Sequence, residues 1–305
     1  MNFNNFQILL SVFSLIFVGY ISKAFKIIDE DFARKAIKFL FFLPLPILVF
    51  LSFATTKLDI SLGIYPIISI IIQSILIVIS YFIGKLLKFD NKTIGTLIAA
   101  SGITSTLVFA LPFIQAFYGI ENLKYLFMYD FGNGLMAWTV VYLITGYLGN
   151  KKQLGIKKGI ISFVKNPMIF ALFFGVIFGL LNIKLPQFFT QFKTTLSGFI
   201  NPLLFVSIGI LLDFKYFLSK ENLTKLFLSA GIIMGVSVLL AFMFTSLFDI
   251  SGIGQKVILI SAVSPAAALA VAFSVEHDLD QKFASALVAF TMVLGIILVP
   301  LIILL

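Results

Sequence analysis

Long apolar blocks separated by short polar stretches follow one another along the whole chain. A helix needs about 20 mostly apolar residues to cross a bilayer, and connections add roughly 5–10 residues. The 305 residues therefore hold about ten spans. We place them at residues 6–22, 39–55, 61–84, 93–118, 122–148, 166–182, 195–212, 223–247, 253–275 and 283–305. The first block has no basic residue before it and no clear cleavage site, so we interpret it as a span and not as a signal peptide.

The polar stretch DEDFARKAIK, from Asp29 to Lys38, differs from the other connections because it is charged along its length. It opens with acidic and closes with basic residues, the order that a helix dipole favours. We predict a short surface helix here that leads into the second span.

The basic residues divide unevenly between the connections, and this predicts the orientation of the chain. Of the 22 Lys and Arg residues, 17 fall in the odd-numbered connections counted from the N-terminus. The five others are Lys57, Lys124, Lys184, Lys193 and Lys256. Cytoplasmic connections are enriched in Lys and Arg, so the odd ones are predicted to be cytoplasmic. With ten spans, both termini then face outside, and the chain is a multi-pass protein.

The polar stretch from about Gly149 to Lys165 divides the chain into two halves of five spans each. At an offset of 156 residues, Gly19 aligns with Gly175 and Pro46 with Pro202. Five is an odd number, so the second half must enter the membrane from the opposite side, as in many secondary transporters. We therefore predict a first five-helix repeat at 1–150, a cytoplasmic linker at 151–165 and an inverted second repeat at 166–305.

Two prolines within predicted spans mark sites where helices could be interrupted. Pro112 lies in the fourth span and Pro265 in the ninth, which we interpret as corresponding positions of the two halves. Proline removes a backbone donor and leaves a carbonyl without its helical partner. In lipid such groups must be satisfied, so both breaks are expected in the protein interior or on a water-filled cavity.

Composition excludes several classes of function. Hydrophobic residues make up 60% of the chain and charged residues 11%, too few charges for the surface of a soluble protein. The basic residues occur in short runs between apolar blocks, which argues against nucleic-acid binding. There is no cysteine and one histidine, His277, in the segment EHDLD, which we predict to be a solvated loop. No paired catalytic groups are present, so we do not expect an enzyme, a metal site or a cofactor.

Four segments, taken in order, resemble one known family. They are STLVFALPFIQAFYG (105–119), YDFGNGLMAW (129–138), KNPMIFALFFGVIFG (165–179) and SPAAALAVAFSVEHDLDQKFASALV (264–288). Together they are similar to the auxin efflux carrier family, which includes plant PIN-type carriers and bacterial permeases. The resemblance implies an all-α integral membrane fold of ten transmembrane helices in two inverted five-helix repeats, with broken fourth and ninth helices that cross. It also implies a scaffold domain and a transport domain that move against each other.

The sequence departs from this family at the predicted crossing. The family commonly has Asn where this chain has Ser105, and Gly where it has Ala110. A serine keeps a donor and an acceptor but has a shorter reach. The identity of the substrate therefore cannot be taken from a relative.

No Lys or Arg lies at the middle of a predicted span, so an organic anion would need other partners. Half-helix N-termini supply N–H groups and partial positive charge, and neutral side chains add donors. We expect the substrate-binding residues to be Ser105, Thr106, Pro112, Asn133, Ser264 and Pro265. Asp130 lies about eight residues into the fifth span, where a charged acid is costly. It suits a group that takes up and releases a proton, so we expect it to be the ion-coupling residue.

These observations favour a secondary transporter that moves a small organic anion, such as a carboxylate, across the cytoplasmic membrane by alternating access. The coupling ion, proton or sodium, is left open, and so is a homodimer. One alternative is a sodium-coupled symporter of the bile-acid type, and another is a non-transporting membrane sensor. A two-carboxylate cation exchanger is disfavoured, because only Asp130 lies clearly inside a span.

Overall fold

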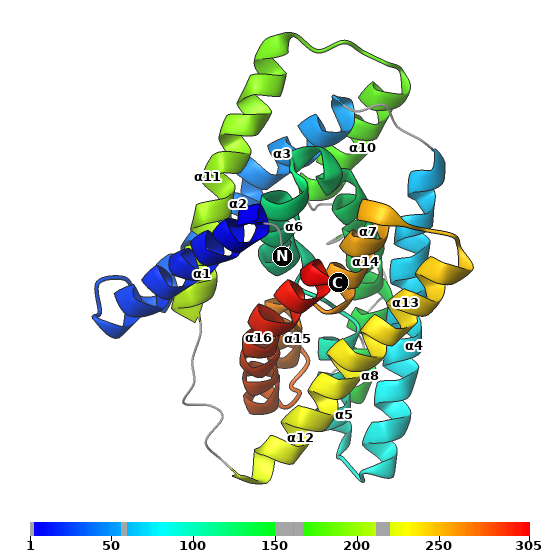
Figure 1. Cartoon of the computed structure of the whole chain (residues 1–305). Coiled ribbons are helices and arrows are strands. Elements are labelled where there is room, and N and C mark those ends of the chain that lie inside the picture. Colours follow the sequence, from blue (N-terminus) through cyan, green and yellow to red (C-terminus); the bar gives the residue numbers. More distant parts are fainter. Residues whose placement is uncertain (1–2, 56–59, 150–160, 162–166, 212–219) are drawn as a thin grey trace.

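The protein is all-helical. The computed structural model describes residues 3–55, 60–149, 161, 167–211 and 220–305 (Figure 1). In this part of the chain the only pairing of extended backbone is an isolated antiparallel bridge between Thr104 and Ala266. The predicted all-α class is therefore confirmed.

The first half of the chain forms helices that follow the predicted apolar blocks. They are α1 (Phe3–Ala24), α2 (Glu30–Phe42), α3 (Pro44–Ala54), η1 (Ile60–Gly63), α4 (Ile64–Leu86), α5 (Asn91–Ser101), η2 (Thr106–Ala110), α6 (Leu111–Tyr118), η3 (Ile120–Asn122), α7 (Leu123–Met136), η4 (Ala137–Val141) and α8 (Tyr142–Leu148). The elements η2 and η4 are π-helical turns that continue directly into α6 and α8. The linker predicted at 151–165 lies, except for residue 161, outside the described residues.

The second half follows the predicted blocks in the same way. Its helices are α10 (Pro167–Leu180), α11 (Gln187–Leu211), α12 (Lys220–Ala230), η6 (Gly231–Val236), α13 (Ser237–Leu247), α14 (Gly252–Ala262), α15 (Ala268–Glu276) and α16 (Gln281–Leu304). Within the described ranges, five stretches are long and apolar enough to cross a bilayer: Glu30–Ala54, Ser61–Leu86, Gln187–Ile210, Leu223–Leu247 and Gln281–Leu304. Ten spans in an inverted repeat stay a prediction.

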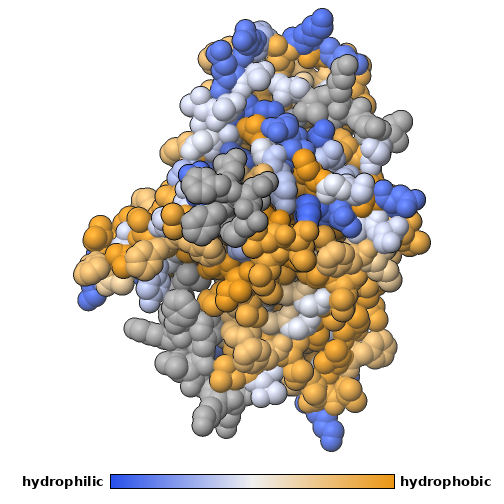
Figure 2. All heavy atoms as spheres, in the orientation of Figure 1, coloured by the Kyte–Doolittle hydropathy of each residue, from blue (hydrophilic) through white to orange (hydrophobic). Residues whose placement is uncertain are grey.

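Large apolar side chains cover much of the molecular surface. Figure 2 shows them gathered over a broad region of the visible face, with hydrophilic residues concentrated above it. Leu86 is 80% exposed, and Phe82 and Leu239 are also exposed on α4 and α13. An exposed apolar area of this extent is unfavourable in water and suits contact with lipid tails. The surface is that of an integral membrane protein.

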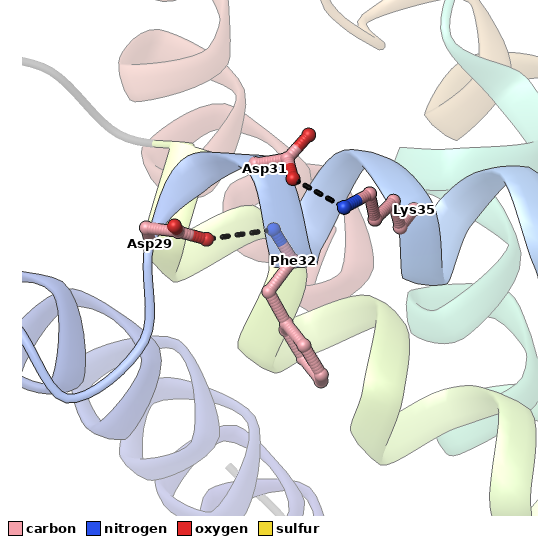
Figure 3. Close-up of polar contacts among 4 residues, drawn as sticks. All are labelled: Asp29, Asp31, Phe32 and Lys35. Atoms are coloured by element: carbon pink, nitrogen blue, oxygen red, sulfur yellow. Dashed lines mark hydrogen bonds and ion pairs between the residues drawn. The ribbon is translucent and has the colours of Figure 1, made fainter.

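The charged stretch after α1 forms a helix, as predicted, but this helix continues to Phe42 and not only to Lys38. The Asp29 carboxylate accepts a hydrogen bond from the Phe32 N–H at 2.9 Å and caps the first turn (Figure 3). One turn later, Asp31 and Lys35 form an ion pair at 2.6 Å. An acid four residues before a base is the favourable order for such a pair. The sequence Leu43-Pro44 then separates α2 from α3.

The helices pack in two groups that meet along a seam. The first group contains α1, α2, α3, α10 and α11, in which α1 packs on α11 and α3 on α10. The second group contains α4 to α8 and α12 to α16. Contacts of α11 with α6 and η2, and of α3 with α7, form the seam between the two groups.

The first group contains two similar close contacts between helices, and the glycine of each contact comes from a different half of the chain. A Cβ atom on Gly19 would overlap the Val206 carbonyl oxygen, so the close approach of α1 and α11 requires glycine at residue 19. In the same way Gly175 of α10 faces the Phe50 carbonyl of α3. The offset of 156 residues that relates Gly19 to Gly175 also relates Phe50 to Val206. The two contacts are therefore equivalent positions of the aligned halves.

Candidate functional site

Two helices of the second group are interrupted. The helix α5 ends at Ser101, and helical structure resumes at Thr106 in η2. The helix α14 ends at Ala262, and α15 begins at Ala268. Both interruptions lie in the molecular interior, where almost every residue of the two segments is buried. The chain is thus broken inside the fourth and ninth apolar blocks.

The two interruptions pair with each other, and we call the paired segments, residues 102–105 and 263–267, the crossing. The Ser105 N–H donates to the Pro265 carbonyl at 2.8 Å, and the Ala267 N–H donates to the Ile103 carbonyl at 3.0 Å. Together these two bonds make the antiparallel bridge centred on Thr104 and Ala266. A helix break in an apolar interior leaves backbone groups without partners, which is costly. Pairing one break with the other satisfies several of these groups at once.

The prolines do not play matching roles, which corrects the sequence interpretation. The pairing is symmetric about Thr104 and Ala266, because the carbonyl groups of Ile103 and Pro265 each accept one of the two hydrogen bonds. Pro265 therefore corresponds to Ile103 and not to Pro112. Pro112 is the second residue of α6 and follows the π-helical turn η2, so it lies inside the helical run that resumes at Thr106. It therefore does not mark the break, which ends before Thr106. Gly102 is the C-cap of α5 at the start of the first interruption, and a Cβ atom there would overlap the Val141 side chain.

Asn133 of α7 binds the centre of the first interruption with both ends of its amide. Its Oδ1 accepts from the Thr104 N–H at 3.1 Å, and its Nδ2 donates to the Thr104 carbonyl at 2.9 Å. A neighbouring strand would satisfy a residue in the same two-sided way. On α4, the Gln73 Nε2 donates to the same Oδ1 at 2.8 Å and fixes the orientation of the amide. Asn133 is 4% exposed and Gln73 1% exposed, so this network is internal.

Asp130 lies beside this network, one turn before Asn133 on α7. Its Oδ1 accepts a short hydrogen bond from the Thr106 hydroxyl and a second one from Asn133 Nδ2 at 3.1 Å. Thr106 is the first residue of η2, immediately after the crossing. Asp130 is half-buried and is the eighth residue of α7. The structure thus brings together three of the predicted site residues: Thr106, Asp130 and Asn133.

The second interruption has a simpler partner on α16. The Ala266 N–H donates to the Thr291 hydroxyl oxygen at 3.1 Å, as the Thr104 N–H does to Asn133. The Ser264 hydroxyl is buried and donates back to the Ile260 carbonyl of its own helix at 2.8 Å. Ser105, by contrast, is half-buried beside the crossing. Of the predicted site residues, Ser105, Ser264 and Pro265 lie in the crossing.

Several buried polar atoms near the crossing have no hydrogen-bond partner within the described residues. They are Gln73 Oε1, Thr104 Oγ1 and Ser261 Oγ. Buried polar atoms in native proteins are nearly always paired, with water or a ligand where protein offers no partner. These atoms are therefore available to bind a polar ligand at the crossing.

The sequence interpretation missed Gln73 and Thr291. Gln73 had a signal, since it is an amide in the middle of the apolar block 61–84. Thr291 had none, because single threonines are common in apolar helices and bond to their own backbone. Indeed Thr291 also donates to the Leu287 carbonyl at 2.8 Å.

His277 is not in a solvated loop, which corrects a second expectation. It is fully buried, and its Nδ1 lies 2.8 Å from the Thr145 hydroxyl of α8. Its ring also meets the Tyr142 ring edge to face at 4.7 Å. Helix α15 therefore ends against α8 and not in solvent. Within the described chain, no three His, Cys, Asp or Glu side chains converge in a way that would hold a metal ion.

Comparison with known proteins agrees with these features. The membrane transport protein family matches residues 6–303. An uncharacterized transporter of Methanothermobacter thermautotrophicus is 26% identical over 302 residues, which cover 97% of this chain and 96% of the relative. An uncharacterized transporter of Methanocaldococcus jannaschii is 24% identical over 308 residues, with the same coverage. The chain therefore belongs to the membrane transport protein family, that of the auxin efflux carriers, and is a transporter and not an enzyme.

Proposed function

We propose that the protein is a secondary transporter that moves a small organic anion, such as a carboxylate, across the cytoplasmic membrane by alternating access. The observation that carries this proposal is the pairing of two interrupted helices about Thr104 and Ala266. Interrupted helices in a membrane protein are tolerated only in the protein interior or on a cavity. In secondary transporters they form the substrate site.

Helix ends at the crossing suit an anion. Two helical segments start there, one at Thr106 and one at Ala268. The first turn of a helix has N–H groups without helical partners and carries partial positive charge. Both starts can therefore face a carboxylate without a charged side chain nearby. The unpartnered Thr104 hydroxyl and the half-buried Ser105 add neutral polar groups.

Asp130 is the proposed coupling residue. A protonated Asp130 is neutral, and a charged one would repel a substrate anion at the adjacent Thr106. The hydrogen bond between these two side chains therefore links the charge state of the acid to the start of η2. A sodium ion bound by the Asp130 carboxylate and neighbouring oxygen atoms would link the two in a similar way. A proton and a sodium ion therefore predict different gradient dependence of uptake.

The proposed architecture has ten spans in two inverted repeats, with both termini outside. The twofold character of the crossing supports the repeat. The equivalent contacts of Gly19 with Val206 and of Gly175 with Phe50 support it independently. The seam between the two groups of helices is where we propose that alternating access occurs.

Uptake into proteoliposomes tests this function. Purified protein would be supplied with labelled monocarboxylates and dicarboxylates, under an imposed proton gradient, a sodium gradient or neither. We expect accumulation of at least one acid above its equilibrium level under one of the gradients, and none in protein-free liposomes. Accumulation under a sodium gradient alone would favour the symporter of bile-acid type. Binding without flux of any acid would favour a sensor and contradict the proposal.

A further inference from the structure

A buried lysine lies in the first group of helices, on the seam. Lys193 was expected in a connection, but it is the seventh residue of α11 and only 6% exposed. By helical rise it is about 9 Å from the start of that helix. A charged residue at such a place is costly, and in membrane proteins it usually marks a functional site.

The protein supplies little to balance this charge. Within the described part of the chain, the Lys193 ammonium donates one hydrogen bond, to the Thr55 hydroxyl at the α3 C-terminus at 3.3 Å. No carboxylate oxygen of the described residues lies within the 4.0 Å of an ion pair. An ammonium has three donors, so two are left over. Buried charges are normally paired, and among the described residues this one has a neutral hydrogen-bond partner only.

Among the described residues, the charged groups around Lys193 leave a net positive charge. Glu121 of η3 and Lys124 of α7 both act on it electrostatically, the acid favourably and the base unfavourably. Glu121 is exposed, so solvent weakens its effect. Glu121 lies in the turn between α6 and α7 and Lys124 in the first turn of α7, so both belong to the second group. Lys193 therefore faces across the seam.

We propose that Lys193, with Thr55 and Lys124, binds the carboxylate of an organic anion at the outer end of the seam between α11 and the α6–α7 turn. The substrate class rests on the function proposed above. The seam continues from here toward the crossing, because Phe205 of α11 packs edge to face on Phe113 of α6, with ring centroids 5.2 Å apart. Lys193 and Phe205 are about 18 Å apart by helical rise. The site is therefore separate from the crossing and holds the anion before or after it reaches the broken helices.

The alternative role for Lys193 is a latch that holds the two groups of helices together through Glu121. The two roles predict opposite results for Glu121→Gln. If Lys193 binds an external anion, removal of the nearby negative charge strengthens that binding. If Glu121 is the real partner of Lys193, the same substitution breaks the latch and gives no gain in anion binding.

The test measures how succinate and acetate raise the unfolding temperature of purified protein at constant ionic strength, with succinamide and acetamide as neutral analogues. A ligand that binds only the folded state stabilises it in proportion to its occupancy, which gives a half-saturating concentration. We expect at least one acid, and neither amide, to stabilise the wild type. Lys193→Met should raise the half-saturating concentration about tenfold or more, as expected for one charge-assisted hydrogen bond. Lys193→Arg should retain binding.

A matched control and a surface variant complete the design. Lys184→Met removes the same charge from an exposed residue in the connection before α11, and should leave the half-saturating concentration unchanged. Glu121→Gln should lower the half-saturating concentration. Because Glu121 is exposed, its substitution can be measured even if Lys193→Met does not fold. The proposal is wrong if the wild type is not stabilised by either acid, if Lys193→Met or Glu121→Gln leaves the value unchanged, or if Lys184→Met raises it equally.

Uptake of the same acids separates this proposal from the proposed function. Stabilisation that depends on Lys193, without uptake of any acid, would retain the anion site and reject transport of carboxylates. Uptake of an acid by a wild type whose stabilisation does not depend on Lys193 would retain transport and reject the anion site.

Discussion

The Asp130 oxygen that accepts from Thr106 accepts from Asn133 as well, so two donors converge on one atom. Asp130→Asn keeps an oxygen at this position and can accept both bonds, but it cannot take up or release a proton. We expect the variant to fold and to exchange substrate across the membrane, and to lose gradient-driven accumulation. The measurement is uptake under an imposed proton gradient, compared with counterflow in the absence of a gradient.

The result for Asp130→Asn has a clear contrary outcome. Accumulation with the pH dependence of the wild type would show that Asp130 does not couple the ion. Thr106→Val provides a partner variant, because it removes the hydroxyl donor and leaves the acid. If the bond between these side chains links coupling to the crossing, Thr106→Val should change the pH dependence of uptake but leave some accumulation.

At the scale of elements, each interruption depends on one side chain from a packed helix. Thr291 accepts the Ala266 N–H on the second interruption. Thr291→Val has nearly the same shape, and it leaves this buried N–H without its partner. We expect a loss of stability of about 1–3 kcal/mol, the cost of one unsatisfied buried group. The melting temperature of the purified protein would measure it.

Thr195→Val is the matched control for Thr291→Val. Thr195 is an exposed residue of α11 whose hydroxyl donates to the Gln191 carbonyl of its own helix at 3.2 Å. Removal of that hydroxyl leaves no buried group unpaired, so the melting temperature should hardly change. Equal effects of the two substitutions would mean that the contact of Thr291 with the interruption does not stabilise the fold.

The start of α5 positions the first interruption, and it is capped by Asp90. The Asp90 carboxylate accepts from the Thr93 N–H at 2.8 Å. Removal of such a cap in Asp90→Ala should cost about 1 kcal/mol, whereas Asp90→Asn keeps an acceptor and should cost less. The melting temperatures of the three proteins at neutral pH test this order.

The stabilisation by Asp90 should also depend on pH. Hydrogen bonds from the Thr93 hydroxyl and N–H, and then the nearby Lys225 and Lys92, hold the pKa of Asp90 below its ordinary value. A carboxyl group with a lowered pKa in the folded state stabilises the fold above its unfolded pKa, about 3.9. That contribution is lost as the pH falls through the folded pKa. The difference in melting temperature between wild type and Asp90→Ala should therefore shrink below about pH 4, and a constant difference would contradict this assignment.

The helices were predictable from the sequence because apolar blocks of the required length mark them. The segment 129–138 also indicated Asp130 and Asn133 as candidate residues, and helical spacing placed them on one face. The pairing of the breaks could not be read in the same way. Pro112 resembled a breaker but lies inside the helical run of η2 and α6. The break lies before Thr106, where the distant Asn133 amide binds Thr104 and Gly102 packs closely on Val141. Such contacts depend on tertiary structure and leave no local pattern.

Lys193 and His277 were misplaced for a related reason. The segment QFFTQFKTTLSG, which starts α11, is rich in polar residues, so its low hydropathy delayed the predicted start of the span to residue 195. The segment EHDLD is polar as well, yet His277 packs on Tyr142. Hydropathy averages over neighbours and does not indicate which single polar side chain points inward.

At the scale of the whole molecule, alternating access requires the two groups of helices to move relative to each other. Within the first group, Gly19 and Gly175 permit backbone contacts that leave no room for side chains between the helices. Across the seam the contacts include side chains such as Phe113 and Phe205. Close backbone packing resists sliding, whereas side-chain contacts can be exchanged for others. The seam is therefore the better candidate for the interface at which the two groups slide.

The predicted orientation of the molecule rests on its charges, because 17 of the 22 Lys and Arg residues fall in the odd-numbered connections. Lys184 and Lys282 are exposed and lie in connections predicted on opposite sides.

The chain has no cysteine, so Lys184→Cys and Lys282→Cys each introduce a unique label site. In intact cells, a membrane-impermeant maleimide should label Lys184→Cys, and should label Lys282→Cys only after permeabilisation. The cysteine-free wild type sets the background. The reverse pattern would place both termini in the cytoplasm, and labelling of both variants in intact cells would contradict the alternation of spans on which the inverted repeat depends.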